Sequence, residues 1–453
     1  MFLFLFIFSI TLLLANIYFF VQKKYLYIFI PCMLFLPKYY GIEFSLSFPV
    51  LTVSRIMFLI LYAYAIVNGR RKIGLYSCTL RSLPKHYVFI GCYFILRLIS
   101  NLYYISSITA ATKTILEIIF EQLLFIIAIF KIAPTREEVE KIIRIVVYTA
   151  FVMFIIGIFE SFTFIRPFDA LYTVSRNMPN QHFVRLGLLR STTTMGFPIF
   201  YGNMCLIILP LVLYLYRQNF QKRFLVISFF NILAIIHSGS RADIFFLIII
   251  VCFYYFIVLK YNTKLSFFKN AIVIIVCIIM FTSILSYVNR NFRFYYEGSL
   301  KAVLNEVGFD FDINKNAPAE DFVYGENRNY GSESRLVQFS GIYYTITQNA
   351  LFGLGAKSQE RYVVNYYSHN NWHPSNTFDV GYVEVFCNEG IIGFLGYFSL
   401  ILAFLYLYIR STNPKSHYKN SIALMTFSYY ICMLSTANMY SFLFLILMLA
   451  FYE

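Results

Sequence analysis

The chain has 453 residues, of which 59% are hydrophobic and only 13% are charged, and its formal net charge at pH 7 is +15. Soluble globular domains carry about 25% charged residues, so this composition excludes an ordinary soluble domain. The positive charge does not indicate nucleic-acid binding, because lysine and arginine lie mostly in short loops between apolar runs, as in multi-pass membrane proteins.

Apolar runs of roughly 20 residues recur along the chain, and each is long enough to cross the hydrocarbon core of a bilayer. Because a spanning segment must satisfy its own backbone hydrogen bonds in lipid, these runs are predicted to be helices. The expected spans are residues 2–21, 25–40, 51–68, 86–105, 112–130, 142–162, 197–216, 224–239, 242–259, 270–288, 382–409 and 420–452.

Run 2–21 is expected to remain in the protein, because it is longer than the core of a signal peptide. Run 420–452 is either one tilted span or two short spans with a turn at 435–438. The sequence therefore predicts an all-α polytopic membrane protein, one domain over 1–453, with about 12 (11–13) transmembrane helices.

A polar segment at 289–380 interrupts the apolar pattern, and its acidic residues roughly match its basic residues. Basic loops are expected on the cytoplasmic side, and the loop at 217–223 is one of them. This orientation places 163–195, the turn at 238–241 and segment 289–380 on the outer face. We therefore expect one large extracytoplasmic loop and three polar elements that converge on one face of the membrane.

The first two polar elements contain arginines at the membrane boundary. Arg185 and Arg190 precede the seventh expected span, which carries Asn203, and Arg241 lies in a turn too short to leave the boundary. A guanidinium group donates hydrogen bonds in a fixed fork that suits phosphate. The alternative for each arginine is a simple contact with lipid headgroups.

The third polar element is the end of segment 289–380. Arg335 lies in an amphipathic stretch that ends in a Gly-x-Gly turn, and three titratable candidates follow, His369, His373 and Asp379. The two histidines stand at helical spacing, but Pro374 and the surrounding asparagines favour a loop. No third ligand has recognisable spacing, so no metal site is predicted. Each candidate is either a general base or a solvated loop residue.

Three further charged residues, Arg97, Glu117 and Glu121, lie within apolar runs. Glu117 and Glu121 are four residues apart and share one face of a helix. These charges either line the same cavity as the three polar elements or form ion pairs between helices.

Together, the three polar elements resemble the O-antigen polymerase and O-antigen ligase family of bacterial inner membranes. The resemblance covers residues 183–393. It rests on an arginine before a Gly/Pro/Asn helix start, on a Ser-Gly-Ser-Arg-Ala turn, and on an ordered series made of Arg335, Gly353, Gly355, Asp379, Tyr382, Gly390 and Gly393. It implies a metal-independent glycosyltransferase that needs no cofactor, with its active face and the loop 289–380 in the periplasm.

The resemblance also implies roles for individual residues. Arg190 and Arg241 match the family's arginines that clamp a pyrophosphate, and Arg335 is expected to assist them. Further expected substrate contacts are Arg185, Tyr382 and Asn203. At the position where family ligases often carry a catalytic histidine this chain has Asp379, which is similar to many polymerases. Asp379 is thus the first candidate base, with His369 and His373 as alternatives.

The resemblance favours an O-antigen polymerase, which joins repeat units carried on undecaprenyl pyrophosphate. The lipid-linked oligosaccharide is then donor and acceptor, membrane lipid surrounds the protein, and a chain-length regulator and a flippase of the same pathway are expected partners. The alternatives are a ligase that transfers glycan to lipid A–core, a flippase or other transporter of lipid-linked oligosaccharide, and a scaffold. The unusual charges gather on one face, which argues against a transporter.

Overall fold

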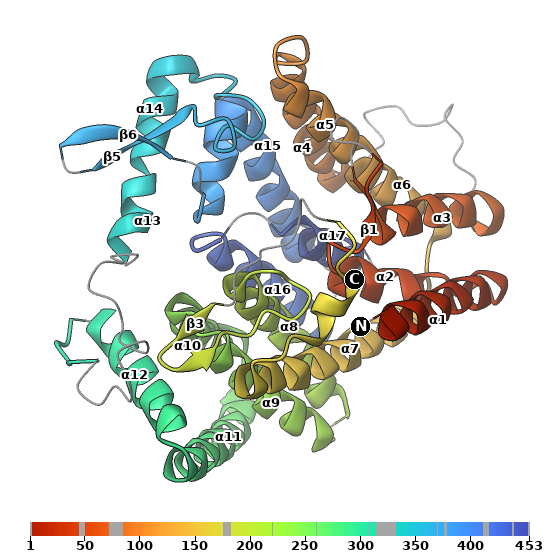
Figure 1. Cartoon of the computed structure of the whole chain (residues 1–453). Helices are drawn as coiled ribbons and strands as arrows, with labels where there is room; N and C mark the ends of the chain where they lie inside the picture. Colours follow the sequence, from red (N-terminus) through yellow and green to blue (C-terminus); the bar gives the residue numbers. More distant parts are fainter. Residues whose placement is uncertain are drawn as a thin grey trace.

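The computed structural model describes residues 2–44, 50–71, 85–174, 183–219, 221–259, 261–306, 308–313, 332–368, 370–375, 378–410, 416–436 and 439–451. Within these ranges the chain is predominantly helical and has three small two-stranded antiparallel sheets (Figure 1).

The elements of the N-terminal part, in chain order, are α1 (Phe2–Val21), α2 (Leu26–Phe35), β1 (Gly41–Ile42), β2 (Leu51–Thr52), α3 (Val53–Asn68), α4 (Lys85–Leu102), α5 (Thr109–Glu117), the π-helical turn η1 (Ile118–Leu123), α6 (Leu124–Ile132), α7 (Arg136–Thr163) and the 3-10 turn η2 (Pro167–Leu171). The middle part contains β3 (Val184–Arg185), β4 (Leu188–Leu189), α8 (Pro198–Asn219), α9 (Arg223–His237), α10 (Arg241–Phe253), the π-helical turn η4 (Tyr254–Val258) and α11 (Tyr261–Val288). The remaining elements are α12 (Arg290–Glu306), α13 (Ser332–Gln338), α14 (Ser340–Asn349), β5 (Val364–Ser368), β6 (Asn371–Ser375), α15 (Gly381–Arg410), α16 (His417–Cys432) and α17 (Tyr440–Ala450).

Six helices are long and apolar enough to cross a membrane: Leu3–Val21, Arg136–Thr163, Pro198–Gln218, Arg241–Val258, Thr263–Val288 and Gly381–Ile409. Four shorter apolar helices accompany them: Leu26–Phe35, Val53–Asn68, Arg223–His237 and Tyr440–Ala450. The expected helical membrane protein is confirmed, whereas the count of about 12 spans stays a prediction. The last expected run, 420–452, contains two helices rather than one.

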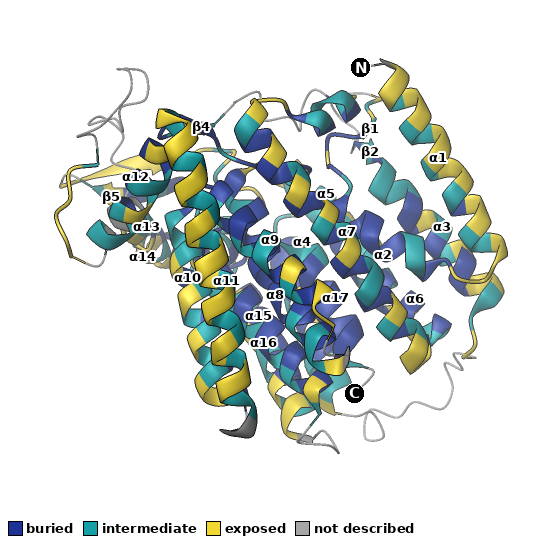
Figure 2. Cartoon of the chain, turned by 90° about the horizontal axis from the view of Figure 1, so that it is seen from below, coloured by how far each residue is buried: buried dark blue, intermediate teal, exposed yellow. Residues whose placement is uncertain are grey.

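The outer surface of the bundle is apolar where lipid would contact it. Helices α1 and α11 lie at the periphery and expose much of their length (Figure 2). On α11, Ile279, Met280 and Ile284 are 57%, 59% and 61% exposed. Such side chains are expected in contact with lipid tails, because the bilayer core is itself apolar.

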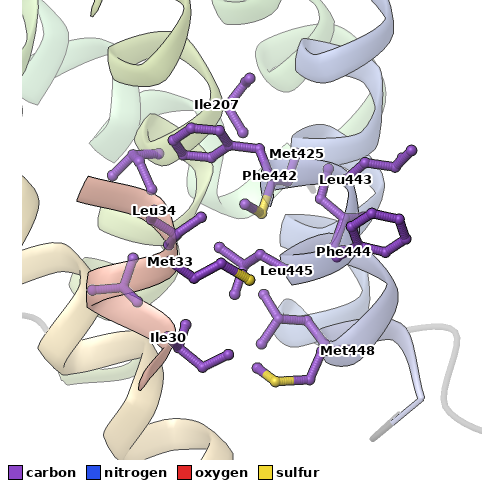
Figure 3. Packing of buried hydrophobic residues seen from close by; sticks show 14 of the residues in the cluster. Ile30, Met33, Leu34, Ile207, Met425, Phe442, Leu443, Phe444, Leu445 and Met448 are labelled. Atoms are coloured by element: carbon purple, nitrogen blue, oxygen red, sulfur yellow. The ribbon is translucent and has the colours of Figure 1, made fainter. Parts of the chain in front are cut away.

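Helix α17 forms the centre of the core. Every side chain from Phe442 to Ala450 is buried. In Figure 3, Phe442 and Met448 lie among Met33 of α2, Ile207 of α8 and Met425 of α16. A helix that is apolar all round is stable only when other helices surround it, so α17 ties distant parts of the chain together.

Helix α15 is broken at Gly390, whose backbone angles (φ 64°, ψ −161°) are not helical. The loop after α14 fills the break, and the N–H of Ile391 donates to the carbonyl of Ala350 at 2.9 Å. A Cβ atom at Gly390 would lie 2.4 Å from the backbone nitrogen of Gly353, so only glycine fits there. The loop that carries the predicted Gly-x-Gly turn is therefore fixed to a membrane helix.

An ion pair inside the bundle joins α4 to α15 beside this break. Arg97 and Glu389 are 1% and 5% exposed, and Arg97 Nη2 lies 2.8 Å from Glu389 Oε1. Arg97 Nη1 also donates to Gln122 Oε1 at 2.8 Å, and Nη2 donates to Tyr440 Oη at 3.1 Å. A buried pair is retained only when such additional hydrogen bonds satisfy the remaining polar atoms.

The two acids Glu117 and Glu121 are also paired. Arg55 Nε donates to Glu121, and Arg55 Nη2 lies 3.9 Å from Glu117. Of the two interpretations given for these charges and for Arg97, ion pairing between helices is confirmed.

Candidate functional site

A short hairpin presents the first two predicted arginines. Strands β3 and β4 are joined by Leu186 and Gly187, with φ values of 51° and 83°. Positive φ at both positions is typical of a tight hairpin turn. Leu186 packs with Tyr295 of α12 in a small apolar cluster, which holds the hairpin in place. Arg185 ends β3, and Arg190 follows β4.

Both arginines bind the end of α9. Arg185 Nη1 donates to the carbonyl of Gly239 at 2.7 Å, and Arg190 Nε donates to the carbonyl of Ser238 at 2.9 Å. The last carbonyls of a helix lack partners within the helix and carry partial negative charge, so they attract cations. The terminal nitrogens of Arg190 form no hydrogen bond with a described residue, which leaves them available to a ligand.

The close approach of Arg190 to Gly239 can be tested by substitution of the glycine. Gly239 has φ +61°, and a Cβ atom there would lie 3.0 Å from Arg190 Cγ. We expect Gly239→Ala to displace Arg190 and to lower product formation in cells without loss of the protein from the membrane. Gly308→Ala is the matched control, because Gly308 also has positive φ (+105°) but would place its Cβ in open space. Equal product from both variants would contradict the assigned contact.

Arg335 of α13 lies close enough to Arg190 for the two charges to interact. Burial lowers the pKa of Arg190 to about 9, and the positive charges of Arg185 and Arg335 act in the same direction. Arg190 therefore stays cationic at neutral pH, at a cost that a bound anion would remove. The structure thus brings three of the predicted arginines together.

Asp243 lies beside this cluster and was not among the predicted site residues. It is fully buried in the first turn of α10, and its charge interacts with those of Arg335 and Arg190. Ser240 is near, but neither carboxylate oxygen of Asp243 has a hydrogen bond of normal geometry to a residue that the structure describes. A Cβ atom on Gly202 would lie 1.9 Å from Asp243 Oδ2, so α8 closes tightly over it. In the sequence, Asp243 could have been recognised as an acidic residue inside an apolar run.

Asp379 is held by the same short helix that carries Arg335. Gln338, which is 3% exposed, donates from Nε2 to Asp379 Oδ2 at 3.0 Å. Gln338 Oε1 accepts from the backbone N–H of Asp379 at 2.9 Å. Arg335 and Gln338 stand three residues apart, so α13 links the arginine cluster to the half-buried carboxylate.

The histidine candidates are less closely associated with the arginines. His369 lies outside the described residues. His373 is exposed on β6 opposite Tyr366, so the expected loop around it is wrong and a hairpin takes its place. Asn370 adopts φ 62° at the turn, which allows the two strands to pair despite Pro374. Burial raises the pKa of Tyr366, and the charge of Asp379 raises it further. Tyr366, the strand partner of His373, therefore lies near the Asp379 carboxylate.

The other three predicted site residues lie on the helices α10, α15 and α8. Arg241 begins α10, two residues after the Gly239 carbonyl that Arg185 binds, and is half-buried. Tyr382 donates its hydroxyl to the carbonyl of Tyr430 at 2.8 Å, within the helical bundle. Asn203 on α8 is fully buried, and neither of its side-chain polar atoms has a hydrogen-bond partner among the described residues.

A buried carboxylate also organises the segment before α8. Glu160 Oε2 accepts hydrogen bonds from the backbone N–H groups of Thr192 and Thr193, at 3.0 and 2.9 Å. The backbone of both threonines makes these contacts, and their hydroxyl groups do not. Glu160 thereby fixes the chain that follows Arg190. In the described ranges, no three His, Cys, Asp or Glu side chains are grouped so that they could hold a metal ion.

These features define a helical membrane protein in which a cluster of arginines lies beside a buried carboxylate. Residues 224–398 match the family model described as O-antigen ligase, and the resemblance to the O-antigen polymerase and ligase family is confirmed there. Members of this family are glycosyltransferase-like enzymes. The family covers both polymerases and ligases, so the match does not distinguish between these two activities. Arg241, Arg335 and Asp379 lie inside the matched region, whereas Arg185 and Arg190 precede it. The curated proteins include no match to the chain.

Proposed function

We propose that the protein is an O-antigen polymerase of the bacterial inner membrane, with its active face in the periplasm. The observation that carries the proposal is the link through α13, which connects the arginine cluster at Arg335 to Asp379 through Gln338. An aspartate rather than a histidine at this family position supports polymerisation over ligation.

In the proposed reaction, a lipid-linked repeat unit is the acceptor and a growing glycan on undecaprenyl pyrophosphate is the donor. Asp379 takes the proton of the acceptor hydroxyl, and that oxygen forms a bond to the anomeric carbon of the donor. The bond between this carbon and the phosphate oxygen breaks, and its electron pair stays on the pyrophosphate. Gln338 already donates a hydrogen bond to Asp379 Oδ2, so Oδ1 is the oxygen that we propose accepts the proton.

The arginines act on the leaving group. Arg190, Arg241 and Arg335 stabilise the negative charge that develops on the departing pyrophosphate, and no metal ion or cofactor is required. Fixed donors of this kind are worth roughly 3–4 kcal/mol each in other enzymes, because they need no rearrangement during the reaction. Arg185, which already binds the Gly239 carbonyl, keeps the hairpin against α9.

A ligase is the second candidate, because the matching family model carries that description. A deletion strain separates the two functions by gel electrophoresis of its lipopolysaccharide. A polymerase mutant carries a single repeat unit on the core, and we expect this pattern. Bare core would identify a ligase, and an unchanged ladder would reject both functions.

A further inference from the structure

Four aromatic side chains gather on the surface of the β5–β6 hairpin and α14, and we call them the aromatic patch. Trp372 on β6 is directly opposite Tyr367 on β5, with ring centroids 5.4 Å apart. Tyr343 and Tyr344 of α14 lie 6.2 and 5.6 Å from the Trp372 ring. Trp372 is 41% exposed and Tyr343 is 64% exposed. Figure 1 places the hairpin beside α14 at the edge of the molecule.

The polar side-chain atoms of the aromatic patch make no hydrogen bond within the part of the chain that the structure describes. No hydrogen bond joins the three phenol hydroxyls or the Trp372 indole N–H to another described residue. Tyrosine and tryptophan usually find partners for these groups when they are buried, whereas on an exposed surface the groups remain accessible to a ligand. Exposed rings with free donors are suited to a ligand that has an apolar face and hydroxyl groups at its edge.

The segments that carry the aromatic patch are uncharged in sequence apart from their histidines. The stretches 336–356 and 362–378 contain no Asp, Glu, Lys or Arg, but they supply amides and hydroxyls, among them Thr347, Gln348 and Asn371. Surfaces that bind anionic headgroups or phosphate carry clusters of Lys and Arg. The neutral aromatic surface therefore fits sugar rings, whose C–H faces stack on aromatic rings and whose hydroxyls pair with neutral polar groups.

The aromatic patch is continuous with the candidate site. The N–H of Tyr367 donates to Ser340 Oγ at 2.8 Å, which ties the hairpin to α14 directly after the helix of Gln338. On the same hairpin, Tyr366 packs in a small core with Val380, the residue after Asp379. The aromatic patch and Asp379 therefore belong to the same small structural unit, and a glycan bound at Asp379 would lie near the patch.

We propose that the aromatic patch is a subsite for uncharged sugar residues of the glycan chain, beyond the residues that react. The proposal rests on the proposed function for the identity of the glycan. Aromatic stacking contributes roughly 0.5–1.5 kcal/mol per ring pair, so loss of one ring should weaken binding about two- to tenfold.

The test uses Trp372 as the reporter, because it is the single tryptophan of the chain. The full-length protein in lipid nanodiscs is titrated with oligosaccharide of one and of several repeat units, released by mild acid from the lipopolysaccharide of the strain that carries the gene. We expect a saturable change in tryptophan fluorescence. Tyr343→Ala and Tyr367→Ala keep the reporter and should raise the dissociation constant about two- to tenfold. Phe309→Ala, which removes another exposed ring (56%) of segment 289–380, should leave it unchanged.

A second set of nanodiscs contains lipids brominated on their acyl chains, which quench tryptophan only when it contacts the membrane. We expect little quenching. Strong quenching without glycan would identify the aromatic patch as a membrane anchor and overturn the proposal, as would the absence of a saturable response. Binding by the patch together with an unchanged lipopolysaccharide ladder in the deletion strain would reject the polymerase and retain the sugar subsite.

Discussion

Arg97→Ala should leave little folded protein in the membrane. The substitution leaves Glu389 as an unpaired charge that is 5% exposed, and breaking a buried pair in this way costs about 3–5 kcal/mol. It also removes the donors to Gln122 and Tyr440 beside the break in α15. The thermal midpoint of the purified protein and its amount in membranes are the measurements.

Two controls separate this effect from a general loss of charge. Arg293→Ala removes an arginine whose pair with Glu297 is exposed, at 61% and 40%, and should change the thermal midpoint little. The double variant Arg97→Leu/Glu389→Leu removes both charges and should be more stable than Arg97→Ala, because no charge is left unpaired. An Arg97→Ala protein as stable as wild type would contradict the structural role of the pair.

Arg190→Ala is expected to abolish long glycan while the protein remains in the membrane. The variant removes a preorganised cation from the departing pyrophosphate, and loss of one such donor lowers turnover about 100- to 1000-fold in other enzymes. Arg190→Lys should recover only part of the activity, because lysine lacks the bidentate fork. Turnover of lipid-linked repeat units by the purified variants is the measurement.

Arg290→Ala is the control for this variant, because Arg290 is an exposed arginine at the start of α12. It should retain wild-type turnover. A normal rate for Arg190→Ala would remove this residue from the proposed mechanism.

Much of the fold could be predicted, because each apolar run carries its own helical signal. The turn at Gly353 and Gly355, which follows α14, was also evident from the sequence, because glycine tolerates positive φ. The hairpin at His373 was not predicted, because Pro374 and the asparagines indicated a loop. The paired strands are short, and the neighbouring α14 supplies part of their packing, which no local pattern reveals.

The candidate site was predicted in part for a similar reason. Arg190 and Arg335 could be proposed because cations at a membrane boundary are conspicuous in an apolar sequence. Gln338 and Asp243 could not be assigned roles, because each acquires its partner only when separate segments meet. Arg97 and Glu389 are 292 residues apart, so their pairing depends entirely on the tertiary fold.

The central claim is that this protein forms glycosidic bonds between lipid-linked repeat units with Asp379 as the base. The most direct measurement incubates the purified protein, and its Asp379→Asn variant, with undecaprenyl-pyrophosphate-linked repeat units and separates the products by size. We expect wild type to make a ladder and to release one lipid pyrophosphate for each bond formed, whereas Asp379→Asn should make neither. A ladder of normal length and amount from Asp379→Asn, or no product from wild type unless lipid A–core is supplied, would contradict the account.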